Sequence, residues 1–235
     1  MIDTIYFDNW NTLVKAPELM KRGSSTRIFR EYLEDRGLDV PNNFIDIYVL
    51  IARAQERKAE SEGHREPEYR QRLEDVFTEL GLSDSFHHSK GAWEHYLRKW
   101  PEQTEYFHGV PEMLADLKED YKLGIITNYM DGPTCREVFL KLGYNDIFDS
   151  LVVSEELGYV KPAQILFETA LKETGSRPEN SVMVGDTFGA DVVGGNLAGM
   201  KTVLVDIYDN QHKNYHEATA VINDINEFPE ALKRL

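Results

Sequence analysis

The chain has 235 residues, of which 41% are hydrophobic, and its 41 acidic against 26 basic residues give a net charge of −15 at pH 7. This composition is typical of a folded globular protein, and the acidity argues against a nucleic-acid partner or a broad contact with an anionic membrane. No apolar run approaches the roughly 20 residues that span a bilayer, and the N-terminus lacks signal-peptide features, so we expect a cytoplasmic protein without a membrane partner.

Short apolar runs that end in polar residues predict buried parallel strands. In chain order they cover residues 5–7, 123–126, 182–184 and 202–205, with a weaker candidate at 151–153. Helical spacing of apolar residues lies between them, at 110–117 and 165–171. Strands that alternate with helices predict an α/β fold, a Rossmann-like doubly wound parallel sheet.

The stretch from residue 16 to residue 99 differs from the rest of the chain. It contains apolar residues at helical spacing around 28–33, 44–51 and 73–80, and no convincing strand. We therefore expect an all-helical domain inserted into the first loop of a discontinuous core, which would comprise residues 1–15 and 100–235. Its position predicts a helical cap over the carboxyl ends of the strands, where ligands bind in open α/β folds.

Polar side chains follow the predicted strands in an ordered series. They are Asp8, Thr127 with Asn128, Lys161, and Asp186 followed by Asp191. Because the carboxyl ends of parallel strands share one edge of a sheet, we expect these groups to converge there. Each of them alone is an ordinary loop residue, but all of them in this order indicate a site.

Such a cluster suits phosphoryl transfer. The Asp8 carboxylate can act as a nucleophile and form a covalent intermediate. Grouped carboxylates repel unless a cation lies among them, and oxygen ligands from Asp8 and Asp186 suit Mg²⁺. Lys161 adds a fixed positive charge and Thr127 a hydrogen-bond donor, which together stabilise a phosphoryl group in transfer.

These motifs resemble those of the haloacid dehalogenase superfamily. The family has a strand ending in Asp-x-Asp-x-Thr/Val, then a Ser or Thr, then a Lys often followed by Pro, and then Gly-Asp with another Asp. Asp8 to Thr12 match the first motif except at one position, and Thr127, Lys161-Pro162 and Gly185-Asp186 with Asp191 match the others. The resemblance covers residues 1–15 and about 100–235, and the inserted helices are similar to the family's type 1 cap.

The resemblance implies a phosphoaspartyl mechanism with Mg²⁺. Asp8 would be the nucleophile, and Thr127, Asn128 and Lys161 would bind the substrate's phosphoryl group. The metal would be held by Asp8, Asp186 and the backbone carbonyl of Trp10. Asp191 would be a further ligand or a support for one.

Trp10 is an informative departure from the family pattern. Family phosphatases usually carry a second Asp at this position, which protonates the leaving group and then activates water. An indole cannot transfer protons at neutral pH. We therefore expect slow phosphomonoester hydrolysis, or hydrolysis restricted to activated substrates. Asn11 replaces the family's usual Gly, and Asn tolerates a left-handed backbone better than most residues do.

Two alternatives stay open. An aromatic residue at the position of Trp10 also occurs in 2-haloacid dehalogenases, and in that reaction Asp8 would displace halide from carbon without a metal. The carboxylates of Asp186 and Asp191 do not suit this metal-free chemistry. The chain could instead be a regulatory module that binds Mg²⁺ and phosphate with little turnover. We favour a hydrolase acting on a small phosphorylated metabolite or another small anionic substrate. The sequence does not predict the oligomeric state.

Overall fold

The computed structural model describes residues 1–15, 23–207 and 215–235, and the chain divides into two compact units. The sheet unit comprises residues 1–15 and 105–235, and the helical unit comprises residues 16–104. The short helix α5 (Trp100–Gln103) belongs to the helical unit, so the division falls a few residues after the expected boundary at residues 99 and 100. Within the described ranges, no helix is long and apolar enough to cross a bilayer.

The sheet unit is built on six parallel strands in the spatial order β3-β2-β1-β4-β5-β6. The strands are β1 (Thr4–Phe7), β2 (Lys122–Thr127), β3 (Ser150–Val153), β4 (Ser181–Gly185), β5 (Lys201–Val205) and β6 (Ala220–Ile222). This arrangement confirms the predicted Rossmann-like sheet, including the weaker candidate at 151–153. Strand β6 was not predicted, because only three residues form it and Val221 in its middle is exposed.

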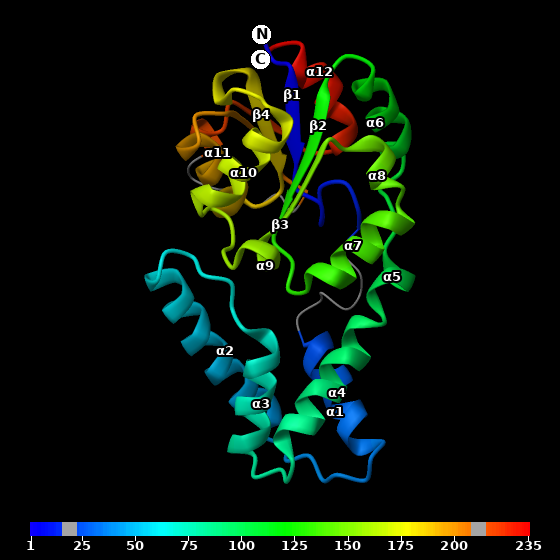
Figure 1. The fold of residues 1–235 in the computed structure, drawn as a ribbon, viewed down its shortest axis with the longest axis vertical. Helices are drawn as coiled ribbons and strands as arrows, with labels where there is room; N and C mark the ends of the chain where they lie inside the picture. Colours follow the sequence, from blue (N-terminus) through cyan, green and yellow to red (C-terminus); the bar gives the residue numbers. More distant parts are fainter. Residues whose placement is uncertain (16–22, 208–214) are drawn as a thin grey trace. The chain divides into compact units, whose positions relative to one another are not determined.

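Helices cover both faces of the sheet, with α10 and α11 on one side and α6 and α12 on the other (Figure 1). The helices of the sheet unit are α6 (Val110–Lys118), α7 (Gly132–Lys141), α8 (Tyr144–Ile147), α9 (Ser154–Leu157), α10 (Gln164–Thr174), α11 (Val193–Leu197) and α12 (Phe228–Leu232). On the first side, Tyr6 and Met183 of the sheet pack with Leu166 and Phe167 of α10 in a buried apolar cluster. On the other side, the ring of Phe7 contacts Phe228 of α12 edge-on.

Strand β1 lies at the point where the chain order of the sheet reverses. Phe7 is paired with Ile125 of β2 on one side and with Val184 of β4 on the other. In open parallel sheets, ligands bind at the carboxyl edge beside such a switch point. The segments after β1, β2 and β4 are therefore the places to look for a functional site.

The helical unit consists of α1 (Ser24–Glu34), α2 (Phe44–Ser61), α3 (Tyr69–Glu79), α4 (Ser85–Leu97) and α5. Its interior is rich in aromatic rings. The ring centroids of Phe29 in α1 and Tyr96 in α4 are 5.3 Å apart, and Tyr96 contacts Trp100 edge-on with ring centroids 5.9 Å apart. Trp100 is fully buried. These aromatic contacts form a core of the helical unit's own, separate from that of the sheet.

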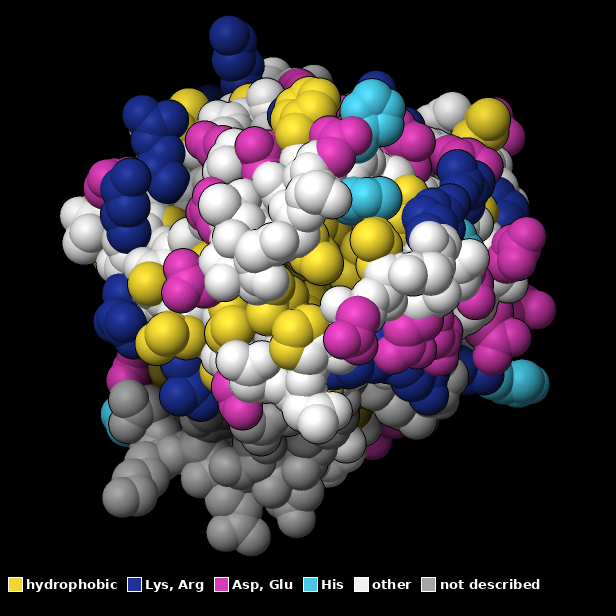
Figure 2. All heavy atoms as spheres, turned by 90° about the horizontal axis from the view of Figure 1, so that it is seen from below, with side chains coloured by type: hydrophobic (Ala, Val, Ile, Leu, Met, Phe, Trp, Pro, Cys, Tyr) yellow, Lys and Arg dark blue, Asp and Glu magenta, His cyan; other side chains and the backbone are white. Residues whose placement is uncertain are grey.

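Several large apolar side chains of the helical unit remain exposed. Leu50 is 68% exposed, Phe86 51% and Ile45 47%. In the view of Figure 2, apolar side chains gather in one area with acidic, basic and histidine side chains around it. The helical unit therefore leaves part of its apolar surface outside its own core.

Candidate active site

Two aspartates extend neighbouring strands at the switch point. Asp8 follows β1 and Asp186 follows β4, and the backbone N–H of Asp8 donates to the carbonyl of Val184 at 2.8 Å. This bond continues the pairing of the two strands to their ends. Carboxylate oxygens of Asp8, Asp186 and Asp191 all lie within 4.8 Å of one another. The structure therefore brings together the three carboxylates that sequence analysis grouped.

Lys161 joins this cluster from the segment before α10. Its Nζ donates to Asp8 Oδ1 at 2.7 Å, to Asp191 Oδ1 at 2.6 Å and to the carbonyl of Ile126 at 2.7 Å. Its side chain is only 2% exposed. A buried ammonium needs this degree of pairing, because an unpaired charge away from water is strongly unfavourable. The three bonds also tie together the ends of β1 and β2 and the turn that carries Asp191.

Asp191 lies in a π-helical turn, η3 (Phe188–Val192). One of its carboxylate oxygens accepts from Lys161, and the other accepts from the backbone N–H of Thr187 at 2.9 Å. Gly185 leaves room for this side chain, because a Cβ on residue 185 would lie 2.7 Å from the Cβ of Asp191 and still nearer to its carboxyl group. The Gly-Asp motif thus has a steric reason: the glycine admits the buried Asp191.

The charges in the cluster perturb one another. Burial raises the pKa of Asp8 to about 6, against the opposing effect of Lys161. Burial and repulsion by Asp8 and Asp191 raise the pKa of Asp186 to about 7. Burial alone would lower the pKa of Lys161, but its contacts with Asp191 and Asp8 outweigh that effect and leave the pKa above its usual value. An excess of negative charge concentrated in this way is suited to a cation.

Thr127 is the last residue of β2 and Asn128 follows it, beside the cluster. The Thr127 side chain is fully buried, and within the described part of the chain no hydrogen-bond partner reaches its Oγ1. A buried hydroxyl without a partner is unusual and suits a group that contacts a ligand. Asn128, expected to bind substrate, uses its Oδ1 to accept from the backbone N–H of Lys161 at 2.7 Å. This contact gives Asn128 a part in placing Lys161.

Trp10 is buried and stacks on Tyr129, with ring centroids 5.3 Å apart. The backbone N–H of Tyr129 in turn donates to Ser154 Oγ at 2.9 Å. Asn11 has a φ of 62°, the left-handed conformation that its type tolerates. Tyr129 was not predicted as a site residue, although its aromatic ring two positions after Thr127 is a feature of the sequence.

Asn9 fixes the other side of the loop after Asp8. Its Oδ1 accepts from the hydroxyl of Tyr144 at 2.7 Å, and both side chains are fully buried. The carbonyl of Asn9 also accepts from the backbone N–H groups of Leu13 and Val14, at 2.9 and 3.1 Å. The loop from Asp8 to Val14 is therefore held by its own backbone and by α8.

The donor set at this edge fits a magnesium ion. Mg²⁺ prefers oxygen ligands and commonly uses one or two carboxylates together with water and phosphate oxygens. Lys161 and the Thr187 N–H already bond to both oxygens of Asp191. Asp186 is half-buried and, besides its contacts with neighbouring charges, accepts a long hydrogen bond of 3.3 Å from Thr187 Oγ1. Asp8 and Asp186 are thus better placed as ligands, and Asp191 as their support.

Comparison with known proteins agrees with this geometry. The sequence model of the family described as "Haloacid dehalogenase-like hydrolase" matches residues 50–205. A glyceraldehyde 3-phosphate phosphatase from Methanothermobacter thermautotrophicus is 31% identical over 231 residues, which cover 94% of this chain and 88% of that protein. The chain therefore belongs to the haloacid dehalogenase-like hydrolase family and is an enzyme of the phosphatase-like kind.

Solved structures show the same fold. A 2-haloacid dehalogenase from Pseudomonas syringae pv. Tomato DC3000 superposes with a TM-score of 0.79 at 22% identity, covering 100% of this chain and 99% of that one. The Bacillus subtilis protein YfnB, in a magnesium-bound form, superposes with a TM-score of 0.69 at 23% identity, covering 98% of both chains. At these identities the likeness is one of fold, and it confirms the family's architecture.

Proposed function

We propose that the chain hydrolyses phosphomonoesters of small metabolites in a Mg²⁺-dependent reaction that passes through an aspartyl-phosphate on Asp8. The observation that carries the proposal is the buried contact of Lys161 with both Asp8 and Asp191, beside the third carboxylate of Asp186. The M. thermautotrophicus relative is a glyceraldehyde 3-phosphate phosphatase, which supports a substrate of that class. We assign residues 16–104 the role of a cap, and we expect the enzyme in the cytoplasm.

Each site residue has its own role in the proposed reaction. A carboxylate oxygen of Asp8 attacks phosphorus, forms a P–O bond and displaces the ester oxygen of the substrate. Water then attacks phosphorus and breaks the bond to Asp8, which releases phosphate. Lys161 and the Thr127 hydroxyl hold the phosphoryl oxygens throughout. When bound at Asp8 and Asp186, Mg²⁺ supplies positive charge that neutralises the phosphoryl oxygens.

The chain places no proton donor at position 10. Where the family's second aspartate would protonate the leaving group, this chain has the indole of Trp10 stacked on Tyr129. The leaving oxygen must therefore depart as an anion or take its proton from water. Acyl and aryl phosphates, whose leaving groups are stable as anions, are the substrates that suit this site.

Phosphate release and halide release measured side by side, each with Mg²⁺ and with a chelator, test the proposal. Phosphate release that requires Mg²⁺ and is lost in Asp8→Asn supports it. Unchanged phosphate release by folded Asp8→Asn would overturn the assignment of the nucleophile.

The same experiment tests the dehalogenase alternative, which Trp10 favours. In that reaction Asp8 would attack carbon and expel halide, so release would continue in the chelator. The cluster of Asp186 and Asp191 opposes this alternative, because it adds negative charge where the substrate is an anion. If the protein binds Mg²⁺ and phosphate but releases neither product, it is the regulatory module instead.

A further inference from the structure

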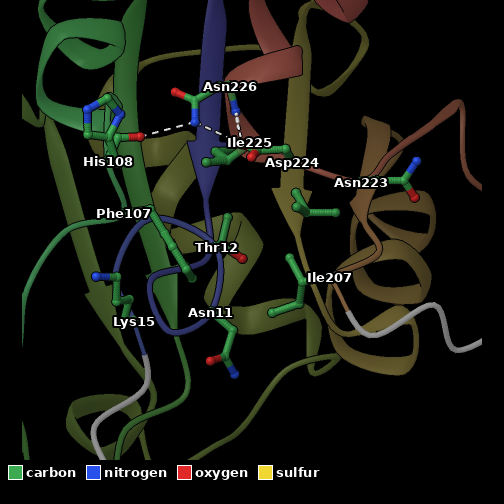
Figure 3. A pocket seen from close by; sticks show the side chains of 11 residues that line it. Asn11, Thr12, Lys15, Phe107, His108, Ile207, Asn223, Asp224, Ile225 and Asn226 are labelled. Atoms are coloured by element: carbon green, nitrogen blue, oxygen red, sulfur yellow. Dashed lines mark hydrogen bonds between the residues drawn. The ribbon is translucent and has the colours of Figure 1, made fainter.

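A pocket of about 300 Å³ lies in the sheet unit, and its lining residues do not include the three clustered carboxylates (Figure 3). Four segments form its wall: the loop after β1, the residues before α6, the end of β5 and the loop after β6. All of them belong to the sheet unit, so the pocket does not depend on the helical unit. Its volume is at the lower end of the range of about 300–1,000 Å³ that is typical of small-molecule sites.

Both apolar and polar side chains line the pocket. In Figure 3, Phe107, Thr12 and Ile207 extend toward the same space from three different segments. Thr12 is fully buried, and its Oγ1 has no hydrogen-bond partner among the residues that the structure describes. Apolar side chains combined with a few polar groups, one of them a buried hydroxyl, are usual in a site for a small molecule.

The polar rim of the pocket is held in place and is locally acidic. Asn226 Nδ2 donates to Asp224 Oδ1 at 2.8 Å and to the carbonyl of His108 at 3.1 Å, which fastens the loop after β6 to the start of α6. The positive charge of Lys15 is already paired with Glu105 at 2.7 Å. Asp224, in contrast, has the neutral amides of Asn226 as its hydrogen-bond donors. Its carboxylate can accept further hydrogen bonds from a ligand and repels an anion.

We propose that this pocket binds a small uncharged aromatic or heteroaromatic compound that carries N–H or O–H donors. The ring lies between Phe107 and Ile207, and its donors meet Asp224 at the rim. Asn11 and Thr12 belong both to the pocket wall and to the loop that begins at Asp8. A ligand in the pocket therefore contacts the loop that follows the nucleophile, and occupancy is coupled to the geometry of that loop.

Titration of the ¹⁵N-labelled full chain with 4-hydroxybenzamide, followed by NMR, tests the site. We expect shifts confined to residues around 12, 107, 205–207 and 223–226, with a dissociation constant of about 1 mM. The matched anion 4-hydroxybenzoate should bind more weakly, because it meets Asp224. No shifts at saturating ligand, shifts centred elsewhere, or tighter binding of the anion would overturn the proposal.

Two substitutions and a matched control complete the test. Ile207→Trp fills the pocket and should weaken binding at least about tenfold, which is about 1.4 kcal/mol. Val221→Trp places the same ring on the exposed side of β6, outside the pocket, and should leave binding unchanged. Asp224→Asn keeps the shape of the exposed rim and should reduce the preference for the neutral compound. Equal binding by all three variants would contradict the site, whatever the outcome of the phosphatase assays.

Discussion

Trp10 stacks on Tyr129 across the loops that follow the neighbouring strands β1 and β2, with the ring planes inclined by 26°. The first loop begins at Asp8 and the second follows Thr127, so the stack joins the segments that carry the proposed nucleophile and the phosphoryl-binding hydroxyl. Trp10 therefore has a structural role besides replacing the acidic residue of the family pattern. It packs together the two loops that follow β1 and β2.

The first prediction concerns the leaving group. We expect the rate of the wild-type enzyme to fall steeply as the leaving group of an aryl phosphate becomes more basic, because the site supplies no proton. Trp10→Asp should flatten this dependence and raise the rate with alkyl phosphates by about 10²–10⁴-fold. Steady-state kinetics on a graded series of aryl and alkyl phosphates measures both effects.

Trp10→Asn is the matched control for that prediction. Asn has nearly the size of Asp and opens the same space, but it cannot transfer a proton at neutral pH. It should therefore leave the steep dependence in place. If Trp10→Asp and Trp10→Asn raise the rate with alkyl phosphates equally, the gain comes from removal of the ring and not from the new carboxyl group.

The second prediction concerns the stability of the stack. Tyr129→Leu removes the ring but keeps an apolar side chain. It should lower the free energy of unfolding more in the wild type than in a Trp10→Leu background. The coupling between the two residues should be about 0.5–1.5 kcal/mol, the usual value for a buried aromatic pair. Urea unfolding of the two single variants and the double variant measures it. A coupling near zero would show that the two rings merely lie next to each other.

The third prediction concerns Lys161 and pH. Lys161→Met leaves buried carboxylates without their cation and should reduce the free energy of unfolding by about 3–5 kcal/mol near neutral pH. Loss of the ammonium, which opposes the effect of burial, raises the folded-state pKa of Asp8 further above its unfolded value. Acids shifted in this direction stabilise the fold when protonated, and this stability is lost as the pH rises through the folded pKa. The penalty should therefore grow from about pH 5 to about pH 8.

Lys15→Met is the control for Lys161. It also removes a lysine from an ion pair, but the Lys15 side chain is 52% exposed and its partner Glu105 is 69% exposed. Exposed pairs contribute little to stability, so this variant should stay close to the wild type over the same pH range. Equal losses in the two variants would argue against a special role for the buried lysine.

The fourth prediction links magnesium to protons. Asp186, with a pKa of about 7, and Asp8, with a pKa of about 6, take up protons in the metal-free protein as the pH falls through these values. Mg²⁺ must displace those protons, so its affinity should rise from about pH 5.5 to about pH 8 and then level off. Calorimetry in two buffers with different ionisation enthalpies counts the protons released.

Asp186→Asn provides the comparison for magnesium. It removes one proposed ligand and one titrating group, so magnesium binding should weaken and fewer protons should be released. The metal-free variant should also be more stable than the wild type above about pH 7, because less negative charge is buried. A magnesium affinity that does not change with pH in the wild type would contradict this account.

The sequence predicted what depends on short apolar runs and on strand order. Residues 5–7, 123–126, 182–184 and 202–205 form strands because their continuous apolar side chains are buried on both faces of a parallel sheet. β6 was missed because a short edge strand lacks that pattern. Convergence of the carboxylates followed from topology, since the ends of β1 and β4 are adjacent.

Contacts between distant side chains were beyond the reach of the sequence. The aromatic residue after Thr127 is visible in the sequence, but its contact with Trp10 is not. That contact depends on how two loops fold back after adjacent strands. The use of Asn128 to bond the backbone of Lys161 is a similar case, since the two residues come from different loops. Patterns in a sequence record burial and chain direction, whereas these pairs depend on three-dimensional packing.

The last prediction concerns the glycine before Asp186. In Gly185→Ala the new methyl group would lie 2.7 Å from the Cβ of Asp191 and closer still to its carboxyl group, which Lys161 and the Thr187 N–H hold in place. Asp191 must move or the strand end must shift, and overpacking of this kind costs about 1–3 kcal/mol. Because Asp191 also supports Lys161, phosphate release should fall by more than the loss of folded protein explains.

Gly189→Ala separates this steric effect from the general effect of adding a methyl group. Gly189 lies in the same π-helical turn as Asp191, but a Cβ there would meet no atom within 4 Å. Its alanine variant should keep wild-type stability to within about 0.5 kcal/mol and retain activity. Thermal unfolding and phosphate release measured on both variants decide the matter. If the two alanine variants behave alike, Gly185 is not needed to admit Asp191, and the steric reason for the Gly-Asp motif is wrong.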